Sequence, residues 1–444
     1  MPRTLSGKSS ASTARSRDHP PALTVVRSRL DILFVSPWHP WPATTAGAHQ
    51  RIFQLVAALA QRHRVTLVTP LHAGEANAPD DPLIDLCARV IRIPDSVPGS
   101  AATPASDAQR STAHQLKDLL VSPVPRSSHW RNEALLRALR QLRLACRFDA
   151  VWAERTFTAE LLRQAGFDRI IVDVDDVASI AMKRHLRHYA HTYPRIEQVM
   201  LTAERLKLTS YERGLPRRYA HLVVCKEADR EFFGKRASCV HVVPNGATPY
   251  SACDGRGEDG ATTLFVGNLA HFPNVDAVSF FWDAILPEIE RLHAGARFVV
   301  AGRSVPPALQ ALHDGQSCII TGPIPDLAPI YATASLVVVP MRLGSGTRIK
   351  VLEALARGKA MVSTSIGIEG IDLRPGIDVI VADEPKAFAQ TCARLLGDAA
   401  ARRRLGRMAR ERVLDRYGWD MIADAADRVV HLAARSLSDI MGPA

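Results

Sequence analysis

The sequence lacks any apolar run that approaches the roughly 18 to 20 residues needed to span a bilayer, and no signal-peptide core follows its first residues. Its seven cysteines lie at least fourteen residues apart, without a C-x-x-C pair, which argues against a cysteine-based zinc site and is typical of a reduced compartment. Regularly spaced aromatic residues are missing from its most basic stretch, as is any nucleic-acid-binding motif. These absences predict a cytoplasmic protein, soluble or peripheral to a membrane, without a nucleic-acid partner.

The chain is long enough for two ordinary domains, since 47% of its 444 residues are hydrophobic and each domain can bury a core. The net charge of +11 comes from residues 1–30 and residues 179–218, where basic residues exceed acidic residues by five and by six. Residues 1–28 are rich in serine, arginine and proline without periodicity. This composition predicts a disordered basic tail, with a transit peptide as the alternative.

Short apolar runs alternate with helical stretches, which predicts α/β domains built on parallel sheets. A first series of candidate strands comprises residues 31–35, 65–69, 90–93, 150–153, 169–174 and 221–225. A second series comprises residues 263–267, 297–301, 318–321, 336–340, 360–364 and 378–382.

The two series meet at residues 245–262, a stretch dense in glycine, aspartate and serine. We therefore expect two doubly wound, Rossmann-like domains facing each other, with a ligand in the cleft beyond the carboxyl ends of their strands. The expected units are a tail at 1–28, a first domain at 29–247 with a mobile insertion at 95–112, a second domain at 248–418, and a helix at 419–444 that packs back towards the first domain.

Residues 342–355 read RLGSGTRIKVLEAL, a glycine-rich loop followed by apolar residues at helical spacing, with a serine or threonine available as the helix cap. Arg348 and Lys350 lie in the first turn of this helix, where the macrodipole disfavours cations unless an anion is bound. Arg303, after a neighbouring strand, adds a further cation. This pattern predicts an anion site, and three solvated surface charges are the alternative.

Glu353 follows in the same helix, beyond its first turn, and a carboxylate there suits a pair of ribose hydroxyls because it accepts two hydrogen bonds. The alternative is a salt bridge at i,i+3 or i,i+4 spacing, for which Lys350 is available. In the first half, Gly47 opens a helix whose free N–H groups suit a phosphate, or it serves only as a tight turn.

Several stretches resemble the nucleotide-binding domain of family 4 retaining glycosyltransferases of the GT-B fold, the group 1 type. They are FVGNLAHFPNVDAVSFFWDAILP, RFVVAGR, TGPIPDLAPIYATASLVVVPMRLGSGTRIKVLEALARGKAMVSTSIGIEG and RRRLGRMARERVLDRYGWD. The first half resembles the acceptor domain of that family more loosely, through the Gly47 loop, residues 223–233 (VVCKEADREFF) and residues 242–247 (VVPNGA). The resemblance is most specific over residues 263–370.

The resemblance implies transfer of a sugar from a nucleotide-sugar to a sugar or lipid-linked acceptor, such as a polysaccharide precursor. It implies retention at the anomeric carbon, with no cofactor and no metal ion. Arg303, Arg348 and Lys350 would neutralise the diphosphate. The backbone of Pro323 and Ile324 would contact the base, and Glu353 the ribose. The other donor-binding residues that it implies are Gly47, Gly267, Asn268, Ser345, Gly346 and Thr347.

The sequence departs from the family pattern at the position of the donor sugar. The first glutamate of the usual pair falls on Ser345, and the basic pair downstream of the first glycine loop is absent. Where the family often has a cleft-facing histidine, the strand in IIVDVDD ends with Asp173, Asp175 and Asp176. We predict that Asp175 or Asp176 contacts the acceptor or the donor sugar, with capping of the next helix as the alternative.

Three other functions fit parts of the sequence. The D-x-D in IIVDVDD matches the metal-binding signature of the other large glycosyltransferase architecture, which has a single nucleotide-binding domain. A nucleotide-sugar 2-epimerase shares the fold and needs no acceptor. The basic stretch at residues 182–219 favours a non-enzymatic protein that binds an anionic membrane surface, and such a contact also suits a lipid-linked acceptor.

Overall fold

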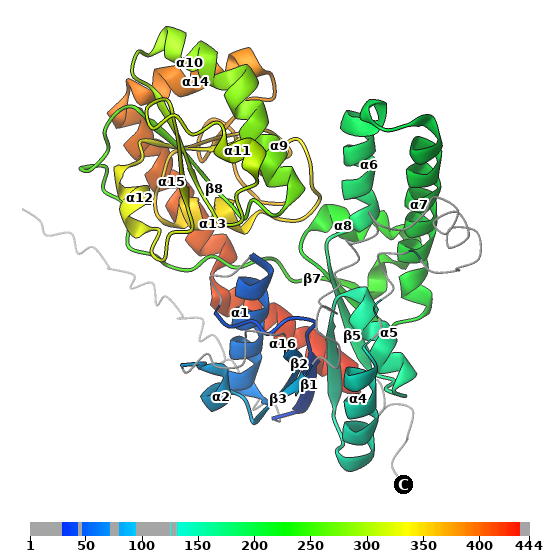
Figure 1. Ribbon diagram of the computed structural model, residues 1–444. Coiled ribbons are helices and arrows are strands. Elements are labelled where there is room, and N and C mark those ends of the chain that lie inside the picture. Colours follow the sequence, from blue (N-terminus) through cyan, green and yellow to red (C-terminus); the bar gives the residue numbers. More distant parts are fainter. Residues whose placement is uncertain are drawn as a thin grey trace, which may run out of the picture.

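The computed structural model describes residues 29–42, 47–71, 80–94, 125, 130 and 132–435. These residues form two parallel α/β domains, which lie one above the other in Figure 1. The tail expected at residues 1–28 and the insertion expected at 95–112 lie outside the described residues. Among the described helices, none is both long enough and apolar enough to cross a membrane.

The first domain contains a seven-stranded parallel sheet in the order β3-β2-β1-β4-β5-β6-β7. The strands are β1 (Asp31–Val35), β2 (Arg64–Leu71), β3 (Arg89–Pro94), β4 (Ala150–Glu154), β5 (Ile170–Asp175), β6 (His221–Val224) and β7 (Val240–Val242). The central strands are continuous buried apolar runs, as a sheet covered on both faces requires. The first six match predicted strands, whereas β7 is a three-residue edge strand, too short for its pattern to be recognised.

Helices cover both faces of this sheet. The core on one face includes residues of α4, α5 and α7, and the core on the other includes residues of α1 and α16. The helices of the first domain are α1 (Gly47–Arg62), α2 (Leu83–Leu86), α4 (Glu133–Ala145), α5 (Thr156–Gln164), α6 (Ala178–Tyr189), η4 (Ala190–Thr192), α7 (Arg195–Gly214), η5 (Leu215–Arg217), α8 (Glu227–Phe232) and η6 (Gly234–Cys239).

The second domain contains a six-stranded parallel sheet in the order β10-β9-β8-β11-β12-β13. The strands are β8 (Thr262–Val266), β9 (Arg297–Ala301), β10 (Cys318–Gly322), β11 (Leu336–Val339), β12 (Met361–Ser363) and β13 (Ile380–Val381). Its helices are α9 (Phe272–Phe280), the π-helical turn η7 (Phe281–Ile285), α10 (Leu286–Leu292), α11 (Pro307–Gln310), α12 (Ala328–Thr333), α13 (Ile349–Ala356), α14 (Pro385–Leu396) and α15 (Ala399–Tyr417). All six strands match the second predicted series.

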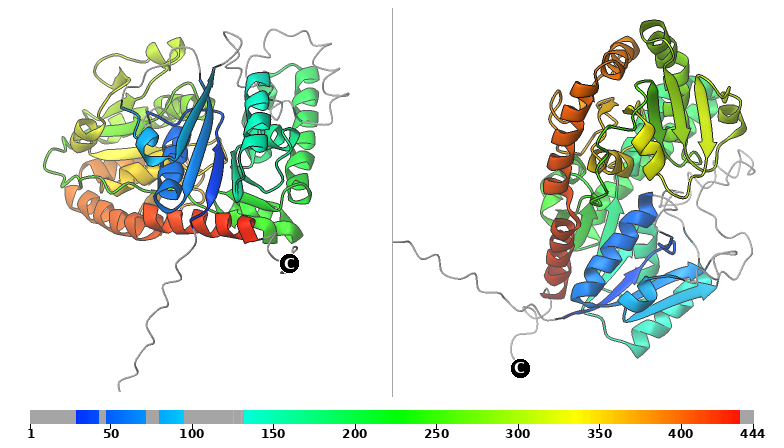
Figure 2. Two further views of the ribbon diagram at one scale, coloured as in Figure 1. Left: turned by 90° about the horizontal axis from the view of Figure 1, so that it is seen from below. Right: turned by 90° about the vertical axis from the view of Figure 1, so that its left-hand side faces the viewer.

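Helix α16 (Trp419–Arg435) follows α15 and joins the core of the first domain, so that the two helices run along both domains in Figure 2. Its buried Asp427 accepts a hydrogen bond from His63 Nε2 at 2.8 Å. His63 Nδ1 accepts from the Leu30 N–H at 3.3 Å, which assigns the ring proton to Nε2. Although His431 completes a His-Asp-His cluster, this tautomer leaves Nε2 of His63 without a lone pair for a metal ion. The cluster is therefore a hydrogen-bonded anchor.

The loops that follow β8 and β9 are in backbone contact, which fixes the edge of the second sheet that faces the first domain. Leu269 N donates to Arg303 O at 2.9 Å, and a Cβ at Gly302 would lie 1.9 Å from Gly267 O. Residue 302 must therefore be glycine for the two loops to pack.

We expect Gly302→Ala to destabilise the protein by about 1–3 kcal/mol, the usual cost of overpacking, or more because the clashing atom belongs to the backbone. Thermal unfolding followed by circular dichroism measures the change. Gly397→Ala is the matched control, since a Cβ there would meet its nearest neighbour at 3.7 Å. Equal melting temperatures for the two variants would contradict the packing argument.

Candidate functional site

The starts of helices α1 and α13 meet where the two domains face each other (Figure 1). A Cβ at Gly47 would lie 3.2 Å from Cδ1 of Ile349, so the first residues of the two helices are in contact. Neither helix has an acidic residue in its first turn. Because each N-terminus presents unpaired N–H groups and partial positive charge, this junction favours an anion.

The loop before α13 turns its carbonyl oxygens towards protein donors. All five carbonyl oxygens of residues 343–347 accept side-chain hydrogen bonds: Leu343 O and Gly346 O from Arg348, Gly344 O from Arg184, Ser345 O from Lys226 and Thr347 O from Asn245. By contrast, no described group accepts from the backbone N–H groups of residues 344–350. The buried hydroxyl of Thr347 also lacks a partner in the described part of the chain. Together these groups form a row of donors without acceptors.

Lys350, whose backbone N–H belongs to this row, directs its ammonium to the loop after β8 and the start of α9. Its Nζ donates to Asn274 Oδ1 at 2.5 Å and lies 4.2 Å from the ring centroid of Phe265. No described carboxylate forms an ion pair with it. Burial, and secondarily the charge of Arg348, lower the pKa of Lys350 to about 7. A Cβ at Gly267 would lie 2.9 Å from this Nζ, so glycine there makes room for the lysine.

The other two predicted cations differ in their surroundings. Burial lowers the pKa of Arg303, whose guanidinium, like Lys350, has no ion pair with a described carboxylate. Arg348 instead turns back on its own loop, 7% exposed, and burial lowers its pKa to about 10. The expected serine or threonine cap of α13 is wrong: Arg348 occupies the cap position without a side-chain cap bond. The Ser345 hydroxyl donates to Asp176 instead, and that of Thr347 has no partner in the described chain.

Glu353 lies one turn further along α13. It pairs with Arg357 at 3.2 Å and i,i+4 spacing, which is the salt bridge expected as the alternative to a ribose contact, with Arg357 in place of Lys350 as the partner. Burial raises the pKa of Glu353, and Arg357 opposes this rise. One carboxylate oxygen, Oε1, accepts the Arg357 hydrogen bond. The predicted ribose contact of Glu353 remains a prediction.

An acidic cluster from the first domain faces this loop. Asp173 Oδ2 lies 3.0 Å from Arg51 Nη2, and Asp175 Oδ2 lies 2.6 Å from Arg155 Nη2. Both Arg155 and Asp175 have positive φ, at 74° and 62°, which is backbone strain of the kind that gathers at functional sites. Burial favours a higher pKa for Asp175, but Arg155 and Arg51 outweigh it and lower that pKa. Burial raises the pKa of the neighbouring Glu154 well above its usual range.

Asp176 connects the cluster to the second domain. Its Oδ2 accepts a hydrogen bond from Ser345 Oγ at 2.6 Å, and its Oδ1 faces Arg155 at 3.3 Å. The alternative role of capping the next helix is wrong for both aspartates, because α6 begins at Ala178 with Val177 as its uncapped boundary. Ser345, which replaces the expected glutamate, is 1% exposed and bound to a carboxylate from the other domain.

The structure brings some of the predicted residues together and leaves others apart. Gly47, Gly267, Ser345, Gly346, Thr347 and Lys350 lie in contact around the loop, as do Asp175 and Asp176 beside it. Asn268 caps its own turn by accepting from Ala270 N at 3.1 Å. Pro323 is exposed and Ile324 packs against the domain core, with no described contact to the loop. Their roles remain predictions.

Four contributors were not predicted: Arg184, Lys226, Asn245 and Asn274. Arg51, in the first turn after Gly47, was expected on a solvated helix face, but it is 1% exposed and binds Asp173. All four unpredicted residues lie in stretches already noted: Lys226 in VVCKEADREFF, Asn245 in VVPNGA, Asn274 in FVGNLAHFPN and Arg184 in the basic stretch at residues 182–219. A strand followed by a polar residue was the available signal, but it does not reveal which loop of the other domain that residue reaches.

Residues 260–398 match the family model described as glycosyl transferases group 1. These residues are similar to a group 1 glycosyl transferase domain. The whole structure is similar to that of Anabaena Alr3699/HepE in complex with UDP and glucose, with a TM-score of 0.60 and 12% identity over 91% of this chain and 100% of that one. It is also similar to an α,α-trehalose-phosphate synthase (UDP-forming) from Burkholderia vietnamiensis, with a TM-score of 0.57 and 12% identity over 93% and 99% of the chains. The predicted GT-B fold is thereby confirmed.

A protein of Klebsiella pneumoniae is similar to part of this chain in sequence. It is described as an uncharacterized 44.6 kDa protein in the cps region and is 28% identical over 135 residues. The match spans 29% of this chain and 35% of that protein's length.

Proposed function

We propose that the protein transfers a sugar from a nucleotide-sugar donor to an acceptor, with retention at the anomeric carbon and without a metal ion. The observation that carries this proposal is the loop of residues 344–350, whose N–H groups have no acceptor among the described residues. A diphosphate supplies the acceptor oxygens and the negative charge that this loop and the α13 N-terminus favour. The similarity of residues 260–398 to a group 1 glycosyl transferase domain supports the same class.

The chemistry follows from where charge develops. When the bond from the anomeric carbon to the diphosphate breaks, the leaving oxygen gains negative charge, which fixed donors stabilise best. Lys350 and Arg303 supply cations without carboxylate partners in the described structure, and the loop supplies N–H groups. The Asp176–Ser345 pair, at the edge of the same loop, supplies a carboxylate for the donor sugar or the acceptor.

The names of two similar structures and of one relative support a class of donor and a class of acceptor. Alr3699/HepE is described in complex with UDP and glucose, and the trehalose-phosphate synthase as UDP-forming. UDP-sugars are therefore the donors that we propose first. The Klebsiella relative belongs to a cps region, which supports a polysaccharide precursor as the acceptor.

Thermal shift with UDP, UDP-sugars and other nucleotide-sugars tests the donor site, since a ligand that binds only the folded state raises the melting temperature. We expect UDP and at least one UDP-sugar to stabilise the protein. Product analysis of the positive donor then tests transfer: nucleoside diphosphate released in step with glycosylated acceptor, with the anomeric configuration read by NMR. Absence of any shift across the nucleotide-sugars would overturn the proposal.

Two other enzyme classes would give different experimental results. A 2-epimerase converts the nucleotide-sugar without an acceptor and accumulates no nucleoside diphosphate. A D-x-D enzyme loses activity with a chelator, which we do not expect, because the oxygens of Asp173 and Asp175 accept hydrogen bonds from Arg51, Arg155 and Cys225. Arginine, rather than a metal ion, balances their charge.

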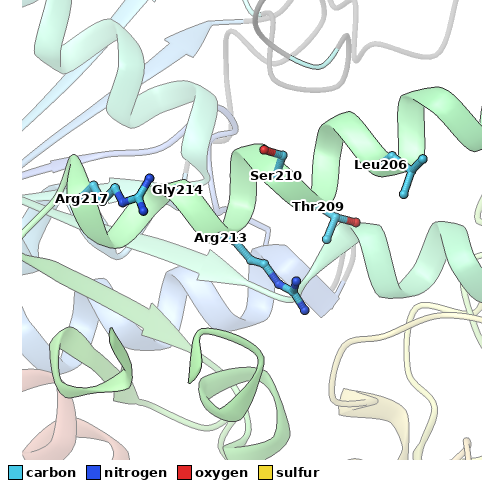
Figure 3. Close-up of a pocket in the computed structure, with 6 residues that line it drawn as sticks. All are labelled: Leu206, Thr209, Ser210, Arg213, Gly214 and Arg217. Atoms are coloured by element: carbon cyan, nitrogen blue, oxygen red, sulfur yellow. The ribbon is translucent and has the colours of Figure 1, made fainter. Parts of the chain in front are cut away.

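Helix α7 offers a surface for an anionic membrane that carries a lipid-linked acceptor. Ile196, Val199 and Leu206 are 56%, 69% and 56% exposed on it. Leu206 also borders a hollow of about 370 Å³ whose lining includes Arg213 and Arg217 (Figure 3). Exposed apolar side chains next to arginines suit insertion at the level of anionic headgroups.

We expect the protein to sediment with vesicles that contain phosphatidylglycerol, and Val199→Glu with Leu206→Glu to lower the bound fraction several-fold. The reason is that both changes place a carboxylate at an apolar, anionic interface. Leu144→Glu on α4 is the matched control, since Leu144 is 85% exposed on another helix. Equal binding to neutral and anionic vesicles would remove the membrane from the proposed partners.

A further inference from the structure

Two cations of the first domain bind the backbone of the loop in the second domain. Arg184, on α6, donates from Nη1 to Gly344 O at 2.5 Å. Lys226, which precedes α8, donates from Nζ to Ser345 O. These carbonyls belong to consecutive residues, 160 and 119 positions away from their donors in the sequence. Neither cation reaches the loop unless the two domains are packed together.

Glu369 of the second domain holds both cations in place. It accepts from Arg184 at 2.6 and 2.9 Å and lies 3.3 Å from Lys226 Nζ. It also lies 3.8 Å from Arg348. Glu369 is therefore the shared acidic neighbour of all three cations. Lys226 has a second acidic neighbour, Asp229 at 3.6 Å, but burial raises the pKa of that carboxyl to about 7 and leaves it partly neutral.

The chain makes room for Lys226, which is 2% exposed. A Cβ at Gly370 would lie 2.6 Å from Lys226 Cδ, and Gly370 has a φ of +78°. Burial of a lysine costs side-chain entropy and desolvation free energy. Apolar residues could join the two domains without these costs. The position of Lys226 suggests a role beyond adhesion.

The geometry of the peptide bond supplies that role. A trans peptide is planar, and its C=O and N–H point in opposite directions. Holding Gly344 O therefore directs the N–H of Ser345 away from Arg184, and holding Ser345 O directs the N–H of Gly346 away from Lys226. Both N–H groups belong to the row that lacks acceptors in the described chain.

We propose that Arg184 and Lys226 are positioning residues, which aim the N–H groups of Ser345 and Gly346 at the diphosphate of the donor. This inference rests on the proposed function and extends it: the first domain prepares the donor site without touching the donor. Diphosphate affinity then depends on residues of the domain opposite to the one that binds it.

The competing explanation is that these contacts only hold the domains together. Another contact between the domains separates the two explanations. Tyr189, also on α6, donates its hydroxyl proton to Asp276 of α9, which also accepts from Arg342 just before the loop. This contact does not involve the carbonyl oxygens of residues 343–347. If adhesion alone matters, loss of this contact weakens diphosphate binding as much as loss of the Arg184 contact.

Calorimetric titration of the full-length protein with UDP and with inorganic pyrophosphate tests the proposal. We expect Arg184→Gln and Lys226→Met each to weaken both ligands about ten-fold, because each frees a carbonyl from a charged donor. Arg184→Lys, which restores a cationic donor, is expected to recover part of the affinity. Tyr189→Phe is expected to bind as the wild type does. Steady-state assays should show the Arg184→Gln effect in the donor KM more than in kcat.

Wild-type affinity in Arg184→Gln, or an equal loss in Tyr189→Phe, would overturn the inference. Circular dichroism shows whether each variant is folded. If Lys226→Met does not fold, Arg184→Gln still tests the inference, since Arg184 is partly exposed. Normal binding by Arg184→Gln together with lost binding by Lys350→Met would leave the donor site standing and remove only this inference. Absence of UDP and pyrophosphate binding by the wild type would overturn both.

Discussion

Lys350→Met is expected to weaken UDP binding about 100-fold at pH 6 and to remove the fall in UDP affinity between pH 7 and pH 9. In the free protein burial, with Arg348, lowers the pKa of Lys350 to about 7. A bound diphosphate favours the ammonium and raises that pKa, so binding takes up a proton near neutral pH. Wild-type affinity should therefore fall as pH rises from 6 to 9, and calorimetry in buffers of different ionisation enthalpy should detect the proton.

The same substitution should stabilise the free protein. The pKa of Lys350 is lower in the folded state than the ordinary lysine value of 10.5, so the folded state binds fewer protons between about pH 7 and pH 10.5. Stability then rises with pH in that window, and the cost of the buried ammonium is greatest below it. Lys350→Met removes this cost, and each kcal/mol gained raises the melting temperature by about 2–4 °C.

The prediction is therefore that Lys350→Met lowers UDP affinity and raises the stability of the free protein. Lys386→Met, at an exposed lysine of the same domain, is the control and should change neither. A variant that loses both stability and UDP affinity would show that Lys350 supports the fold, and would contradict its assignment to the diphosphate.

Asp176→Asn is expected to lower kcat for sugar transfer about 100-fold while UDP affinity stays within about three-fold of the wild type. Asparagine keeps the shape and still accepts from Ser345 Oγ, but the negative charge beside the loop is lost. Separate measurement of kcat and of UDP affinity distinguishes loss of chemistry from loss of the donor site.

An exchange of the two side chains sharpens this test. Asp176→Ser combined with Ser345→Asp returns one carboxylate and one hydroxyl to the same contact between the domains. We expect the double variant to regain part of the kcat that Asp176→Ser alone loses. An unchanged kcat in Asp176→Asn would remove the carboxylate from the mechanism.

Much of the fold is encoded locally, which is why sequence patterns predicted it. A buried parallel strand is a short run of apolar residues, and such runs as DILFV and RFVVA are recognisable without their neighbours. β7 has only three residues, two of them half-buried, and carries too little pattern to be predicted. The capping residues were predicted wrongly because the hydroxyl of Ser345 has a better partner in the other domain than the end of its own helix.

By itself the sequence predicted two parallel α/β domains, an anion site at the loop before α13 and a group of aspartates at the end of β5. Those features depend on neighbours within a few residues. The tertiary structure decided that Arg348 turns back on its own loop, that Lys350 binds Asn274 of α9, and that Asp176 meets Ser345 across 169 positions of sequence. The reason is physical: a hydrogen bond between domains depends on how two sheets are packed, and no local spacing of residues records that packing.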